Sequence, residues 1–159
     1  MLKLRKYGHW YFLAALALAA GLVWQAVFWV ETHQNRVFIH VFDVGQGDAS
    51  FIEAPNGNQV LIDGGPDNSV LSKLGEVMPF WDRSIDLIIL THPHADHLNG
   101  LISVLRHYKV DLFATENLKN NTGGFSRLMD ELKKQNIPTQ HVYAGDKFKF
   151  KDGVILSIV

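Results

Sequence analysis

The chain reads Leu-Ile-Ile-Leu at residues 87–90 and Thr-His-Pro-His-Ala-Asp-His at residues 91–97. The first run has the length and composition of a fully buried strand. The second places three imidazoles and a carboxylate directly at the strand end, where a rigid support can hold a metal site. A single histidine is most often structural, but four potential ligands in one loop bring no benefit to folding. These residues therefore predict a metal centre.

The predicted metal ligands are His92, His94, Asp96 and His97. Imidazole nitrogen suits Zn, Fe, Ni or Mn, and the carboxylate adds a hard oxygen ligand. Because the chain contains no cysteine, a thiolate site is excluded. Side chains that leave a turn point in different directions, so the four ligands can serve two adjacent metal ions rather than one.

Two glycine-punctuated segments precede the histidine loop. Residues 42–49 read Phe-Asp-Val-Gly-Gln-Gly-Asp-Ala, and residues 61–65 read Leu-Ile-Asp-Gly-Gly. Taken alone, the first is best interpreted as a hairpin turn. In the second, Asp63 has two interpretations of equal weight. It is either part of a plain turn or a carboxylate that hydrogen-bonds a ligand imidazole and sets its tautomer.

Together these motifs resemble the metallo-β-lactamase superfamily. Residues 92–97 match its His-x-His-x-Asp-His signature, and the two glycine-punctuated segments resemble the metallo-β-lactamase-like domain of ComEC-type competence proteins. Ala-Gly-Asp at residues 144–146 and Asp-Gly-Val at residues 152–154 fit the same subfamily. The resemblance runs from about residue 37 to the last residue, and all its motifs occur in the order of the family.

The resemblance implies both a fold and a set of residue roles. The implied fold is an αββα sandwich, of which about the first half is present. His92 and His94 would hold a first metal ion, and Asp96 and His97 a second. Two ions about 3.5–4 Å apart activate a water molecule as hydroxide, and Asp96 is the expected catalytic residue that orients it. Zn is the default metal, with Mn and Fe as alternatives. The cleft residues would be Asp43, Gln46, Asp48 and Asp63.

The resemblance also implies ligands that this sequence does not contain. Sites of the superfamily add a third histidine at the first metal, a bridging aspartate, and a last histidine at the second metal. Only His141 follows His107, and its position does not match that of the third histidine. We expect one of three explanations: the chain is the first half of a longer protein, it is a truncated inactive relative, or a second chain completes the metal site.

The N-terminal segment has a different character. Residues 10–30 contain no charged side chain, and as a helix they would be about 30 Å long, the hydrocarbon thickness of a bilayer. Lys3, Arg5 and Lys6 predict a cytoplasmic N-terminus. The predicted organisation is a basic tail at 1–9, a transmembrane signal-anchor helix at 10–30, a connector at 31–36 and a domain at 37–159. That domain would lie on the extracytoplasmic side of the cell membrane.

A cleaved signal peptide is the rival interpretation of this segment, since residues 17–19 read Ala-Leu-Ala, a small-x-small site. Cleavage there would leave two apolar runs, residues 22–24 and 27–30, at the new N-terminus, so we favour an uncleaved anchor. A buried core helix is less favoured because the segment is apolar all round.

Periodicity predicts an α/β pattern in which hairpins come first and strand–helix units follow. Further helices are expected at 69–77, 97–108 and 125–135. Strands are expected at 37–43, 48–54, 59–62, 86–90, 110–114, 139–143, 147–150 and 154–159. This pattern is compatible with the sandwich that the resemblance implies, but the pattern alone would not name it.

The net charge of the predicted domain limits how it could bind a nucleic-acid substrate. Residues 31–159 carry 12 Lys and Arg against 16 Asp and Glu, a net charge of −4. The sequence has no basic cluster that would grip a nucleic acid, so a nucleic acid or nucleotide substrate would depend on the metal ions. The leading hypothesis is a membrane-anchored metallo-hydrolase that cleaves phosphodiesters, with DNA suggested by the ComEC resemblance. The alternatives are a non-catalytic metal-binding or assembly-partner protein, and a lactonase or thioesterase.

Overall fold

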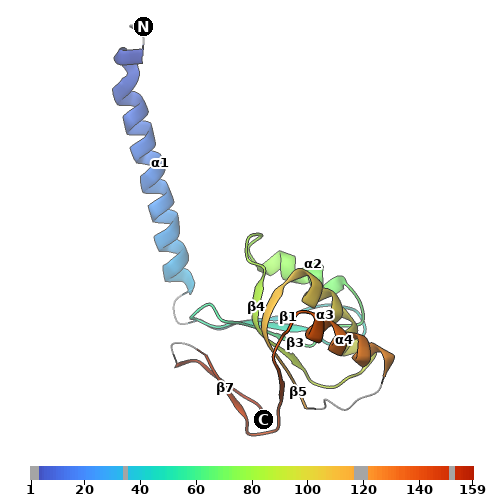
Figure 1. Ribbon diagram of the computed structural model, residues 1–159. Coiled ribbons are helices and arrows are strands. Elements are labelled where there is room, and N and C mark those ends of the chain that lie inside the picture. Colours follow the sequence, from blue (N-terminus) through green and yellow to red (C-terminus); the bar gives the residue numbers. More distant parts are fainter. Residues whose placement is uncertain (1–3, 34–35, 117–121, 151–152) are drawn as a thin grey trace. The chain divides into compact units, whose positions relative to one another are not determined.

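The computed structural model describes residues 4–33, 36–116, 122–150 and 153–159. The chain divides into two compact units, Met1–Arg36 and Val37–Val159. The described residues of the first unit contain one helix, and the second unit is a mixed α/β domain (Figure 1).

Helix α1 of the first unit extends from Leu4 to His33. Its segment Gly8–Val27 is long and apolar enough to cross a membrane, judged by length and composition, and none of it is buried. The helix predicted at residues 10–30 is therefore present and continues for several residues at each end. The apolar side chains of Gly8–Val27 are exposed and so gain no packing energy within the described part of the protein, which is compatible with a helix whose solvent is lipid.

The second unit is built on a six-stranded sheet with the strand order β1-β2-β3-β4-β5-β6. Strands β1 to β3 pair antiparallel, and β3 to β6 pair parallel. The strands are β1 (Phe38–Val41), β2 (Ser50–Glu53), β3 (Gln59–Ile62), β4 (Ser84–Leu90), β5 (Lys109–Thr115) and β6 (Thr139–His141). A separate antiparallel hairpin consists of β7 (Lys147–Lys149) and β8 (Ile155–Ser157).

Three helices of this unit are α2 (Ser69–Val77), α3 (Ala95–His107) and α4 (Gly123–Lys134). They pack on one face of the sheet, and the β7–β8 hairpin packs on the other (Figure 1). Strand β4 lies between these layers and is buried on both faces: Ile88 and Leu90 join the helix-side core, while Leu87 and Ile89 join the hairpin-side core. Each such side chain contributes about 1.5–3 kcal/mol by leaving water. This double burial explains the unbroken apolar run of β4.

The hairpin covers only part of its face of the sheet. Phe148 of the hairpin packs with Val60 and Leu87 of the sheet. At the edge strand β1, however, Ile39 and Val41 are 66% and 80% exposed. By register Ile39 is paired with Ile52, and Ile52 with Val60, so the exposed side chains belong to the hairpin-side face.

Every strand and helix that the sequence predicts in the second unit is present, with ends displaced by at most two residues. The α/β class is confirmed. One displacement matters for the site: α3 begins at Ala95, not at residue 97, because His94 is its N-cap residue with φ −85° and ψ 152°. Asp96 and His97 therefore lie in the first helical turn rather than in the loop. Asn68 is the N-cap residue of α2.

Candidate metal centre

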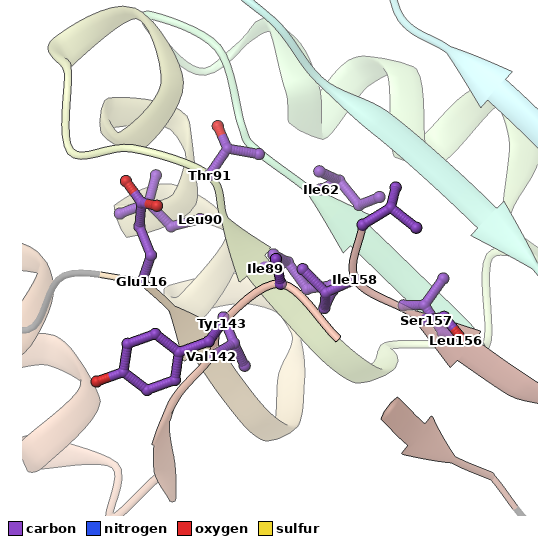
Figure 2. A pocket seen from close by; sticks show the side chains of 12 residues that line it. Ile62, Ile89, Leu90, Thr91, Glu116, Val142, Tyr143, Leu156, Ser157 and Ile158 are labelled. Atoms are coloured by element: carbon purple, nitrogen blue, oxygen red, sulfur yellow. The ribbon is translucent and has the colours of Figure 1, made fainter. Parts of the chain in front are cut away.

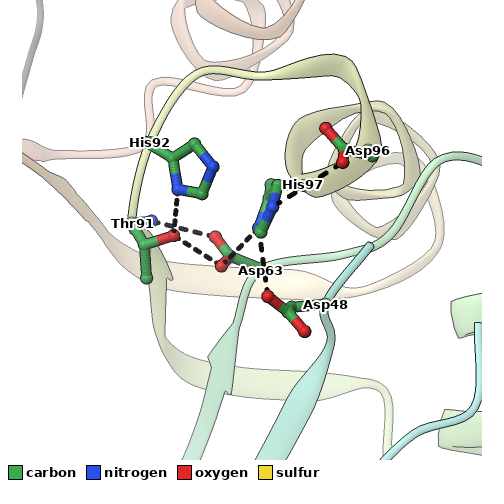
Figure 3. A network of polar contacts seen from close by, with 6 residues as sticks. All are labelled: Asp48, Asp63, Thr91, His92, Asp96 and His97. Carbon is green, nitrogen blue, oxygen red and sulfur yellow. Dashed lines mark hydrogen bonds and ion pairs between the residues drawn. The ribbon is translucent and has the colours of Figure 1, made fainter. Parts of the chain in front are cut away.

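The four predicted metal ligands lie at the carboxyl end of β4 and the amino end of α3. Because β3 and β4 are parallel neighbours, the residue that follows β3 reaches the same edge of the sheet. That residue is Asp63, and Figure 3 shows it below the histidine cluster. Two glycines allow α3 to approach so closely: Gly64 N–H donates to the His97 carbonyl at 2.7 Å, and Gly100 N–H donates to the Gly65 carbonyl at 3.1 Å.

The interaction between His97 and Asp63 is the best-defined contact of the site. His97 Nδ1 lies 2.9 Å from Asp63 Oδ2, and the two side chains are only 8% and 3% exposed. An ionised carboxylate can only accept a hydrogen bond, so the proton of the imidazole resides on Nδ1. The lone pair of His97 is therefore on Nε2, the nitrogen that faces away from Asp63. This is the arrangement in which a carboxylate orients a metal-binding histidine.

Asp63 also holds the first residue of the histidine loop. Its Oδ1 accepts a hydrogen bond from Thr91 N at 2.9 Å, and its Oδ2 accepts one from Thr91 Oγ1 at 2.6 Å. The Thr91 hydroxyl gives its only proton to Asp63, so it must accept at its contact with His92 Nδ1, 2.9 Å away (Figure 3). His92 is thereby also protonated on Nδ1, with its lone pair on Nε2. The sequence interpretation missed Thr91, although a hydroxyl residue directly before the first histidine was a visible signal.

Asp63 has a strained backbone. Its φ is 58°, in the left-handed region that few residues other than Gly adopt, although Asp tolerates it better than most. Its N–H donates to the Ile89 carbonyl at 2.9 Å, which ties it to β4. In this conformation the nearly fully buried carboxylate of Asp63 faces three hydrogen-bond donors: Thr91 N, Thr91 Oγ1 and His97 Nδ1. The interpretation of this residue as part of a plain turn does not account for those contacts.

The four predicted ligands are close together but do not surround a common point. The His92 ring centroid is 4.7 Å from that of His94 and 3.8 Å from that of His97. Asp96 Oδ2 lies 3.9 Å from His97 Nε2. Across the described ranges, no three His, Asp or Glu side chains are already arranged to hold a metal ion.

The loop between β1 and β2 borders this cluster, but its side chains differ in their placement. A Cβ on Gly47 would collide with the backbone of Asp96, so the loop and α3 are in direct contact. Asp48 Oδ2 lies 3.9 Å from His97 Nδ1. Asp43, in contrast, is exposed and accepts a hydrogen bond from the N–H of Gly45 at 3.3 Å. Gln46 is exposed, and within the described residues no polar contact joins it to the histidines.

A cavity of about 510 Å³ adjoins the histidine loop. Figure 2 shows its apolar floor on the hairpin side of the sheet, with Thr91 and Glu116 at one end. The apolar lining comes from strand ends and from the last residues of the chain: Ile62, Ile89, Val142, Leu156 and Ile158. Sequence reasoning did not predict this cavity, because its walls come from segments far apart in the chain.

His141, the one histidine after His107 in the sequence, is half-buried. Its ring stacks on that of Tyr143 with a centroid distance of 5.0 Å. Its Nδ1 is buried and has no hydrogen-bond partner among the described residues, and the same holds for Oγ1 of its register neighbour Thr115. Two such buried polar atoms are costly unless water reaches them.

We expect that replacing Thr91 with valine lowers zinc affinity by about 10- to 100-fold, the usual effect of losing a partner of a ligand imidazole. Valine keeps the shape but removes the hydroxyl that links His92 to Asp63. Zinc affinity is measured by competition with a chromophoric chelator, and the His92 tautomer by nitrogen-15 NMR of the metal-free protein. Thr91→Ser is the matched control, because it keeps the hydroxyl. Equal affinities and equal tautomers in the two variants would rule out this role.

Comparison with known proteins places these residues in a family context. The sequence profile of the metallo-beta-lactamase superfamily matches residues 42–156. The chain is 28% identical over 131 residues to ComE operon protein 3 of Bacillus subtilis, covering 72% of this chain and 17% of that protein. It is 42% identical over 72 residues to human microtubule-associated protein 1S, covering 45% of this chain and 6% of that protein.

A third relative is exodeoxyribonuclease WalJ of Streptococcus pneumoniae, which is 29% identical over 72 residues. This match covers 45% of the present chain and 27% of WalJ. The chain thus spans less than a third of the length of each of these three relatives.

Proposed function

Because the chain belongs to the metallo-β-lactamase superfamily, we propose that it is a membrane-anchored, metal-dependent hydrolase that cleaves phosphodiester bonds. The observation that carries this proposal is the chain of contacts from Asp63 to two imidazoles. It turns Nδ1 of both His92 and His97 toward this network, so that Nε2 of each ring carries the lone pair; His97 Nε2 lies 3.9 Å from Asp96 Oδ2. A histidine that serves only for packing does not need hydrogen bonds that fix its proton on Nδ1. A histidine that binds a metal ion through Nε2 does.

The residues present fit a pair of divalent metal ions, with Zn as the first candidate and Mn or Fe as alternatives. His92 and His94 would hold one ion, and Asp96 and His97 the other. When bound, such ions lower the pKa of water and polarise the group that is attacked. The protein itself supplies the rest: Asp63 and Thr91 orient the imidazoles, and the Asp96 carboxylate orients the attacking water.

The name of one relative supports a phosphodiester as the substrate. WalJ is named an exodeoxyribonuclease. The acidic charge of residues 31–159 is consistent with an enzyme that grips one phosphate through metal ions, rather than a long nucleic acid through Lys and Arg. The apolar cavity beside Thr91 would take the group attached to that phosphate.

The membrane location rests on α1. The segment Gly8–Val27 has the length and composition of a membrane-spanning helix, and Lys3, Arg5 and Lys6 precede it. By the positive-inside rule the N-terminus is cytoplasmic and the α/β domain is extracytoplasmic. The protein would be a single-pass membrane protein.

A non-catalytic protein is the second candidate. Microtubule-associated protein 1S, which is named for an association rather than for a reaction, is also similar to this chain. A metal-binding or assembly role, with a second chain completing the metal site, would fit a cluster whose side chains are not arranged around one point in the described residues. A lactonase or thioesterase activity of the same site is the remaining alternative, because one fold supports all of these chemistries.

The test uses the full chain in its membrane, first stripped of metal with a chelator and then reloaded with Zn or Mn. We expect hydrolysis of bis(p-nitrophenyl) phosphate to be lost on stripping and restored on reloading. A β-lactam, a lactone and a thioester serve as comparison substrates. Metal-restored hydrolysis of one of these but not of the phosphodiester would reassign the substrate. Metal binding with no turnover of any of them would favour the non-catalytic candidate.

A further inference from the structure

The loop between α2 and β4 exposes two large aromatic side chains. Phe80 and Trp81 are 81% and 72% exposed, and their rings pack edge to face with centroids 4.8 Å apart. Asp82 N–H donates to the Pro79 carbonyl at 2.9 Å, so the two aromatic residues occupy the corner of a β-turn. Corners of turns favour Gly, Asn, Asp and Pro. The exposed Phe-Trp pair therefore does not contribute to the formation of this turn.

The sheet register places this turn at one defined edge of the domain. Phe38, the first residue of β1, pairs with Glu53, and Glu53 pairs with Gln59, the first residue of β3. Gln59 Nε2 donates to Asp82 Oδ2 at 2.7 Å, directly after the aromatic pair. The turn therefore lies at the end of the sheet where strands β1, β3 and β4 begin. The histidine cluster lies at the opposite end, where β4 ends.

The charged groups near this turn are arranged unevenly. The carboxylates of Asp82 and Asp86 are occupied within the fold: Asp82 accepts from Gln59 and Ser84, and Asp86 accepts from the Gln59 N–H. The nearby cations are exposed, although each has a partner: Arg83, which follows the turn, donates from Nη1 to Tyr108 Oη at 3.2 Å, and Lys109, the register neighbour of Ser84, pairs with Asp111 at 3.4 Å. Exposed aromatic and basic side chains at one edge are the combination that binds the headgroup region of a membrane.

The chain connection indicates which surface this edge meets. Helix α1 ends at His33 and β1 begins at Phe38, and five links of chain reach at most about 18 Å. The edge at which β1 begins is therefore the part of the domain that is tethered to the end of α1. The chain thus enters the domain from α1 at this end of the strands and not at the end that carries the histidine cluster.

We propose that Phe80 and Trp81 insert into the membrane interface and, with Arg83 and Lys109 beside the headgroup phosphates, hold the domain with its histidine cluster directed away from the bilayer. This inference rests on the membrane anchor of the proposed function. Its consequence is orientation: a substrate would be taken from the aqueous side and not from the lipid.

The test exploits the absence of cysteine from the chain. Three single-cysteine variants of the full chain, Phe80→Cys, Ser126→Cys and Ala17→Cys, each carry one environment-sensitive nitrobenzoxadiazole label. They are reconstituted in vesicles of phosphatidylcholine and phosphatidylglycerol, with and without a lipid that carries a nitroxide quencher near its headgroup. Ser126, exposed in the first turn of α4, reports on a side of the domain away from the turn, and Ala17 reports on the centre of the membrane span.

We expect the label at position 80 to be quenched by the nitroxide lipid and its emission to shift to the blue, while the label at position 126 changes in neither respect. Equal behaviour at positions 80 and 126, with a lipid-buried label at position 17, would overturn the inference and leave the anchor standing. A blue shift at position 80 without quenching would indicate contact with protein and would also overturn it. A water-exposed label at position 17 would refute the anchor itself.

Discussion

Replacing His94 with alanine should reduce metal-dependent hydrolysis to the background rate while the domain stays folded. In the proposed site, removing one ligand would weaken the hold on the first metal ion, and with it the lowering of the pKa of bound water toward about 7 that would produce a nucleophile at neutral pH. The fold should tolerate the change because the His94 side chain is exposed and makes no capping hydrogen bond to α3. The carbonyl of residue 94, which accepts from the N–H groups of His97 and Leu98, remains in the variant.

The measurement pairs turnover of bis(p-nitrophenyl) phosphate with thermal unfolding of the same preparation. His107→Ala is the matched control: His107 is an exposed histidine in the last turn of α3, and its ring Nδ1 lies 2.8 Å from the Ser103 carbonyl oxygen, away from the histidine loop. It should keep full activity. Unchanged turnover in the His94 variant would contradict the assignment of the site, and unfolding of that variant would mean that the lost activity carries no information on metal binding.

Replacing Gly100 with alanine should unfold the second unit at a much lower temperature. A Cβ at this position would collide with the Gly64 carbonyl and lie 2.6 Å from the Asp67 carbonyl oxygen. Both neighbours are backbone, so α3 would have to move away from the turn that follows β3. We expect a loss of roughly 3 kcal/mol or more in the free energy of unfolding. Because that turn carries Asp63, metal affinity should fall as well.

Gly75→Ala is the control for this prediction. Gly75 lies in α2, its φ is not positive, and a Cβ there meets nothing within 4 Å. Alanine is the better helix former, so this variant should be more stable by about 0.5–1 kcal/mol. Chemical denaturation of the two variants and the parent gives the comparison. Equal stability of the Gly100 variant and the parent would show that α3 does not pack on the turn as closely as described.

The long apolar helix at the N-terminus and the strand–helix succession could be predicted from sequence because both are local patterns. Residues 87–90 are apolar without interruption, and a strand buried on both faces requires that. Gly8–Val27 lacks charged residues over the thickness of a bilayer. The choice of His92, His94, Asp96 and His97 as candidate ligands was equally local, since four potential ligands stand within six residues. Their use as metal ligands stays a prediction.

The partners of those histidines were decided by tertiary structure. Asp63 lies 28 residues before Thr91 and 34 before His97, yet it contacts both. Parallel pairing of β3 with β4 brings these residues to one edge of the sheet, and the close contact of Gly64 with α3 sets their distance. The same holds for the position of Trp81 at the edge where β1 begins. Sequence determines which side chains are available and which elements form, because both depend on neighbouring residues. Which distant side chains meet depends on strand register and helix packing, and only the folded chain determines these.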